Sequence, residues 1–154
     1  MLRVNKKVEY AIIALIYLGS KEEKTASVRE MSTHCHVPET LLSKIMQTMK
    51  NVGLVSAVYG NQGGYRLNRS LDDVNLLDLT QTISGPIHVA ECLNPENHDC
   101  PVRPSCSIIA PMGVLNQKLI ELFESTSLQA LTPPPDLNTT APRISVRTQE
   151  LAAV

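Results

Sequence analysis

The chain has 154 residues and a formal net charge of −1, a length that fits one domain or one domain with an appendage. Only 3% of the residues are aromatic and none is Trp, so the core has to be mainly aliphatic. The charge is +5 over residues 1–70 and −6 over residues 71–154, which favours an anionic partner for the first half. No phosphate loop, nucleophile–base pair or paired carboxylates are visible, so an enzyme is not expected.

The first twenty residues resemble a secretory signal peptide, because three basic residues precede an apolar run from Ala11 to Leu18. Glu9 precedes the apolar run, no small-residue cleavage site follows, and the run is too short to span a bilayer. Its apolar residues also recur at helical spacing. We therefore predict a first helix over residues 6–19 of a cytoplasmic protein, with a cleaved signal as the alternative. Four cysteines in such a chain indicate metal or redox chemistry more than disulfides.

The next segment has the pattern of a helix-turn-helix. Ser27 and Glu30 form a capping box that starts a short second helix. The turn follows at residues 34–36, and Pro38 suits the first turn of a third helix that Gly53 ends. The inward residues of this third helix are predicted to be Leu41, Leu42, Ile45, Met46, Met49 and Val52.

Residues 54–59 and 65–68 read as two strands around a Gly-rich turn at 60–64, which together predict a wing. Asn75 and Asp78 predict the start of a fourth helix that runs through Ile83. A proline-broken loop over 86–106 precedes a helical apolar stripe of Ile108, Ile109, Met112, Leu115, Leu119 and Leu122. The tail from residue 132 has no periodicity and is predicted to be disordered.

The helix-turn-helix, the wing and the local positive charge together indicate a DNA reader. A helix that enters the major groove presents small polar or basic side chains near its N-terminus. Thr40, Ser43 and Lys44 fit that role, with Gln47 further along, and Asn61, Gln62 and Arg66 supply donors in the wing. Any exposed helix carries some such residues, so the prediction depends on all these features occurring together.

The loop over 86–106 holds Cys92, Cys100 and Cys106, with seven and five residues between them. This spacing fits neither structural zinc sites nor ferredoxin-type clusters well. From the residues alone, three readings stay open: a zinc site completed by His88 or His98, an iron–sulfur site, or thiols without a ligand. Thiolates suit zinc and iron–sulfur clusters alike.

Several segments resemble the bacterial IscR, NsrR and RirA group of winged-helix transcription regulators over about residues 1–131. These segments are residues 9–11, 53–60 and 63–67, followed by the three cysteines. The resemblance implies a homodimer that pairs through a long C-terminal helix and binds operator DNA. The predicted DNA-contacting residues are Thr40, Leu41, Ser43, Lys44, Gln47, Lys50, Tyr59, Asn61, Gln62, Gly63 and Arg66. Tyr59 stands where some members carry an Arg in the wing.

The same resemblance implies an iron–sulfur cluster on Cys92, Cys100 and Cys106, and a 4Fe–4S form is favoured over 2Fe–2S. The IscR branch takes a His three residues after the last cysteine, where this chain has Ile109. The NsrR branch takes an acid from the first helix of the partner subunit, and Glu9 stands at that place, although it also suits a plain helix-start acid. Cys35 is a further candidate ligand that more often would be a buried small hydrophobe.

We therefore predict a mainly α fold with a β-wing, in four segments: a winged helix-turn-helix over 1–85, a cysteine loop over 86–106, a dimerisation helix over 107–131 and the tail over 132–154. The predicted function is a DNA-binding transcription regulator controlled by an iron–sulfur cluster that responds to iron, oxygen or nitric oxide. The alternative is a zinc-stabilised winged-helix DNA-binding or interaction protein without cluster sensing.

Overall fold

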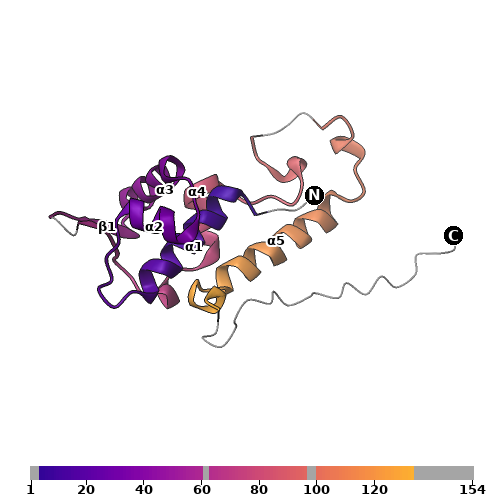
Figure 1. The fold of residues 1–154 in the computed structure, drawn as a ribbon. Helices are drawn as coiled ribbons and strands as arrows, with labels where there is room; N and C mark the ends of the chain where they lie inside the picture. The colour runs from indigo at the N-terminus through magenta and orange to yellow at the C-terminus, as the bar shows by residue number, and fades with distance from the viewer. Residues whose placement is uncertain (1–3, 61–62, 97–99, 134–154) are drawn as a thin grey trace, which may run out of the picture.

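The fold was analysed in a computed structural model that describes residues 4–60, 63–96 and 100–133. Within these ranges, five α-helices and a two-stranded antiparallel sheet follow one another along the chain (Figure 1). They are α1 (Lys6–Ser20), α2 (Val28–Cys35), α3 (Glu39–Asn51), β1 (Val55–Val58), β2 (Gly64–Leu67), α4 (Leu76–Ser84) and α5 (Ile109–Ser125). This mainly helical architecture with a small wing confirms the predicted fold class.

Local capping chemistry sets the helix starts in the helix-turn-helix. The Ser27 hydroxyl accepts a hydrogen bond from the Glu30 amide at 3.1 Å, so α2 begins as the capping box predicts. His36 ends α2 in the left-handed conformation, and Pro38 stands immediately before α3. The inner face of α3 is almost completely removed from solvent, and its buried residues are Leu42, Ile45, Met46 and Met49.

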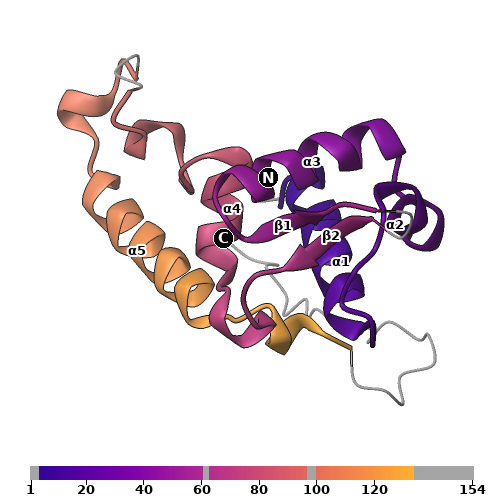
Figure 2. The same cartoon turned by 90° about the vertical axis from the view of Figure 1, so that its left-hand side faces the viewer.

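The wing is a hairpin that a third segment extends. Strands β1 and β2 pair from Val55–Leu67 to Val58–Gly64 (Figure 2). Ala26, just before α2, pairs with Tyr65 of β2 through two backbone hydrogen bonds of 2.8 and 3.0 Å. A Cβ atom at Gly64 would lie 2.3 Å from the carbonyl oxygen of Ala26, so only glycine permits this close approach. The wing is therefore fastened to the helix-turn-helix.

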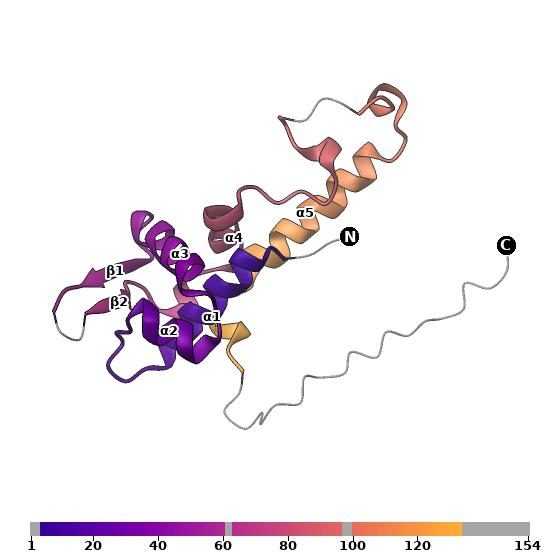
Figure 3. The same ribbon diagram turned by 45° about the horizontal axis from the view of Figure 1, so that its top comes forward.

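Helix α5 leaves the winged-helix body at one end and is tied back to it at the other. Its N-terminal end extends away from the body together with residues 89–96 and 100–108, as Figure 3 shows. Beyond its C-terminal end, the Leu128 amide bonds to the Val74 carbonyl at 2.9 Å, and the Leu76 amide bonds to the Thr126 carbonyl at 2.8 Å. The side chain of Leu128 is completely buried in the common core with α1 and α3.

Some expected details differ from the structure. Val52 was predicted to point inward, but its side chain is 53% exposed because it caps α3, just before Gly53 turns the chain with φ +75°. The expected irregular loop contains two 3-10 turns, at Glu91–Leu93 and Arg103–Ser105. The predicted disordered tail lies outside the described residues, apart from 132 and 133. No helix in the described ranges has both the length and the apolar character needed to cross a membrane.

Candidate DNA interface and cysteine extension

One face of α3 carries the predicted base-reading side chains. Thr40, Ser43, Lys44 and Gln47 are all exposed, and they recur at the spacing of a single helical face. Lys50 is also exposed, one turn further along. Leu41, in contrast, is half-buried and packs against the core. Four polar or basic side chains of α3 thus face solvent while the opposite face is anchored in the core.

The wing presents an exposed aromatic ring and an exposed basic side chain. Tyr59 is 90% exposed at the end of β1. The Arg66 guanidinium is exposed on β2, and its Nε donates to the Ser56 hydroxyl at 3.4 Å across the hairpin. Gly63 is half-buried at the wing turn, whereas the predicted contacts Asn61 and Gln62 lie outside the described residues.

A polar cluster braces α2 against α1. The Tyr17 hydroxyl donates to Glu30 Oε1 at 2.8 Å, and Lys21 forms an ion pair with the same carboxylate. The Lys21 ammonium, then the Tyr17 hydroxyl, lower the pKa of Glu30 below its ordinary value of 4.5. The ring of His34 stacks on the ring of Tyr17 with centroids 4.3 Å apart. Sequence reasoning missed this brace because its members are 4 to 17 positions apart on two helices.

All four cysteines are free, half-buried thiols. Cys35 lies under the helix-turn-helix against the hydrophobic core, and burial raises the pKa of its thiol. Glu9 on α1 is half-buried and pairs with Lys6 of the same helix at 2.5 Å.

Cys92, Cys100 and Cys106 all lie in the segment over 85–108, which we call the cysteine extension. Cys92 is in the first 3-10 turn, and Cys106 directly follows the second. Within the described ranges, no three His, Cys, Asp or Glu side chains come close enough together to hold a metal ion. The backbones of the three cysteines are nevertheless connected through Arg103, whose Nη1 donates to the Cys92 carbonyl at 3.0 Å.

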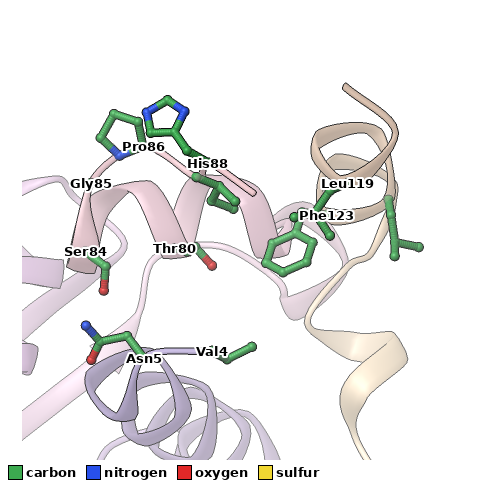
Figure 4. Close-up of a pocket in the computed structure, with 11 residues that line it drawn as sticks. Val4, Asn5, Thr80, Ser84, Gly85, Pro86, His88, Leu119 and Phe123 are labelled. Atoms are coloured by element: carbon green, nitrogen blue, oxygen red, sulfur yellow. The ribbon is translucent and has the colours of Figure 1, made fainter. Parts of the chain in front are cut away.

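A cavity of about 470 Å³ lies where the extension leaves the winged-helix body (Figure 4). Val4 at the start of α1, Thr80 of α4, and Leu119 and Phe123 of α5 line it together with His88 of the extension. The Nδ1 atom of His88 is buried and has no hydrogen-bond partner among the described residues. Beside it, the Val89 amide donates to the Asn116 side chain of α5 at 2.9 Å, which fixes the base of the extension to α5.

Residues 4–134 match the family model of Rrf2, described as an iron-dependent transcriptional regulator. The chain belongs to the Rrf2 family. It is 29% identical to protein aau3 of Rhizobium meliloti (strain 1021) over 84% of each chain. It is also 24% identical to the HTH-type transcriptional regulator NsrR of Halalkalibacterium halodurans, over 84% of this chain and 90% of that one.

Solved structures give the same result for the fold. The global cysteine regulator CymR of B. subtilis superposes with a TM-score of 0.68 at 25% identity, over 86% of this chain and 97% of that one. IscR of T. potens superposes with a TM-score of 0.63 at 22% identity, over 84% and 85%. The predicted family is therefore confirmed, and the chain is a transcriptional regulator rather than an enzyme.

Proposed function

We propose that this Rrf2-family chain acts as a homodimer whose affinity for operator DNA depends on an iron–sulfur cluster, with 4Fe–4S favoured, held by Cys92, Cys100 and Cys106. One observation carries the proposal: the cysteine extension is inserted between α4, which belongs to the winged helix, and α5. A change in the extension therefore acts on the connection between the DNA reader and the helix proposed to pair two readers.

In the proposed complex, the exposed face of α3 enters the major groove. Thr40, Ser43, Lys44 and Gln47 are placed to meet base edges or phosphates, and Lys50 to meet the backbone. The wing approaches the adjacent backbone or minor groove with Arg66 and the exposed ring of Tyr59. Half-buried Leu41 contributes mainly by holding the start of α3 on the core.

The dimer contact is proposed to form along α5, because this helix buries none of its residues in the single chain. Its large apolar side chains remain in contact with water, among them Val114 at 60% exposed, Leu115 at 51% and Leu122 at 58%. An apolar face of this kind marks an interaction surface in a soluble protein. Two-fold pairing would place two α3 helices on successive major grooves, about one helical turn of DNA apart.

The donor chemistry of the extension suits the proposed cluster, because three free thiols lie within one short segment. When bound, the cluster supplies a cross-link within the extension that is sensitive to oxygen and to iron supply. The thiols do not form a ligand group among the described residues, so binding must draw the cysteines together and order the extension. Glu9 is the proposed fourth ligand from the partner subunit, and ligation requires it to leave its pair with Lys6.

The route from the extension to the reader is short. Val89, at the base of the extension, is bonded to Asn116 of α5, and α4 packs against both α5 and α1. An extension ordered by its ligand therefore favours one placement of α5 relative to the winged helix. A difference in operator affinity between the two placements is all that such a regulator needs.

The first test is an absorption spectrum of protein purified without oxygen, with iron, sulfide and zinc quantified on the same sample. About four irons and four sulfides per chain are expected for a 4Fe–4S cluster. A colourless protein that holds about one zinc per chain would instead support the zinc-stabilised alternative.

The second test compares operator binding by the loaded and cluster-free proteins at one fixed salt concentration. The two forms are expected to differ at least fivefold in affinity, the lower end of typical coupling free energies. Lys44→Ala should weaken binding by both forms, whereas Lys7→Ala, an exposed lysine at the start of α1, should not. Equal affinities of the loaded and cluster-free forms for every operator would refute the sensing proposal.

A further inference from the structure

Arg103 is hydrogen-bonded to the backbone of all three cysteines in the extension. Its amide donates to the Cys100 carbonyl at 3.1 Å, and its own carbonyl accepts from the Cys106 amide at 3.4 Å. Its guanidinium Nη1 donates to the Cys92 carbonyl at 3.0 Å.

These three hydrogen bonds differ in what they require of the side chain. The bonds to Cys100 and Cys106 join residues three positions apart and would form for any residue in the same turns. The bond to Cys92 spans 11 positions and exists only because the guanidinium is long and carries several donors. Arg103 thus connects the first cysteine to the pair formed by the other two.

The connection has a physical consequence for ligand binding. Bringing Cys92 to the later cysteines closes a loop in the chain, and loop closure costs conformational entropy. A side chain that already holds the Cys92 carbonyl removes part of this cost before a metal arrives. The half-buried guanidinium also places a permanent positive charge beside residues whose ligating form is anionic.

We propose that Arg103 is a positioning residue: it holds the Cys92 backbone to the turn that carries Cys100 and Cys106, which lowers the cost of drawing the three thiols together around a metal centre, and it supplies a neighbouring positive charge. The inference rests on the proposed function for the identity of the ligands. It adds a residue that touches none of the metal atoms and acts through the backbones of the ligands, as hydrogen-bonding groups around metal sites commonly do.

The first experiment uses cobalt(II) as a probe on the full, metal-free chain, followed by the thiolate-to-cobalt charge-transfer absorption. Arg103→Met is expected to weaken cobalt binding about 10-fold, the lower end of the usual cost of losing such a group. Arg69→Met, which removes an exposed arginine in the winged helix, should leave cobalt binding unchanged. Circular dichroism on each variant checks that the helices are retained.

Cobalt binding by Arg103→Met within twofold of the wild-type value would overturn the positioning role. The absence of any thiolate–cobalt absorption in the wild-type protein would overturn it as well. Because this probe needs neither an iron–sulfur cluster nor DNA, it decides the role of Arg103 even if the proposed sensing function fails.

The second experiment measures the reduction potential of the reconstituted cluster. Loss of a nearby positive charge disfavours the more negative, reduced form, so Arg103→Met should shift the potential to a more negative value. Arg103→Lys keeps the charge but lacks the planar fork, so it should restore the potential while the cobalt affinity stays lowered. An unchanged potential in Arg103→Met would overturn the charge role.

Discussion

Leu128 follows the last long helix, yet its side chain is fully buried with residues of α1 and α3. Leu128→Ala should lower the free energy of unfolding by about 3 kcal/mol, because a buried leucine loses its apolar contacts and leaves a cavity. Urea denaturation would measure the change. Leu131→Ala is the matched control, since that side chain is 38% exposed, and its effect should stay below about 1 kcal/mol. A Leu128→Ala effect as small as that of the control would show that residues 126–131 do not pack on the core in solution.

Glu30 links the pH dependence of stability to the brace between α1 and α2. Its pKa is lowered by the Lys21 ammonium and the Tyr17 hydroxyl, so the charged form favours the folded state. The contribution of this carboxylate is present above its ordinary pKa of 4.5 and is lost as the pH falls through the lowered folded-state value. Because the side chain is 38% exposed, solvent screening limits the contribution to less than about 1 kcal/mol.

Glu30→Gln should therefore be less stable than the wild type at neutral pH and indistinguishable from it in strong acid. Urea denaturation at a series of pH values measures the difference. Glu22→Gln, at an exposed position on the loop after α1, provides a control with no expected pH-dependent difference. A Glu30→Gln deficit that is constant over the whole pH range would exclude the carboxylate as its source.

At the scale of the elements, the sequence predicted best the helix ends that are marked by a capping residue or by a glycine. Ser27 and Asn75 accept the expected capping bonds, and Gly53 follows the end of α3 in the left-handed region. Helical periodicity correctly identified the buried face of α3 up to Met49 but failed at Val52, where the helix had already ended. The 3-10 turns after α4 carry no such periodicity, so the sequence did not predict them.

In the wing, Gly64 packs against the Ala26 backbone only because glycine has no side chain, and this close contact leads to a prediction. Gly64→Ala should lower the free energy of unfolding by about 1–3 kcal/mol, because the new methyl group would meet the Ala26 backbone and push the segment that carries Ala26 away from β2. Gly113→Ala is the control. That glycine lies inside α5 with no atom of another element within 4 Å of an added Cβ, so alanine should stabilise the helix slightly.

Both variants are to be compared by urea denaturation, and the wing itself by amide hydrogen exchange at Tyr65. Faster exchange at Tyr65 in Gly64→Ala alone is the expected result, because the Tyr65 amide donates to the Ala26 carbonyl. Equal exchange rates in the two variants would show that the wing tolerates a larger residue at this position.

At the scale of the whole molecule, the exposed apolar face of α5 leads to a prediction about the oligomeric state in solution. Leu115→Glu should convert the proposed dimer to a monomer, because a carboxylate would have to be buried without a partner. Sedimentation equilibrium would measure the mass, with Gln117→Glu as the control at an exposed polar position of the same helix. An unchanged dimer mass in Leu115→Glu would place the contact elsewhere on the molecule.

The candidate site was only partly predictable from the sequence. The identity of the three cysteines and the polar face of α3 follow from residue types and spacing. The bond from Arg103 to Cys92 and the contact of Val89 with Asn116 do not, because they join positions 11 and 27 residues apart through the fold. Such contacts depend on the path of a segment with little regular structure, and residue spacing does not encode that path.

The backbone bonds of Leu76 to Thr126 and of Val74 to Leu128 hold the two ends of the 77–125 segment side by side. Residues 77–125, which include the cysteine extension, therefore leave and rejoin the core at one place, so the two ends of this excursion are fixed. Insertions or deletions in such an excursion change little in the core and cost little in loop entropy. The number and spacing of the cysteines can therefore change while the winged-helix core is retained.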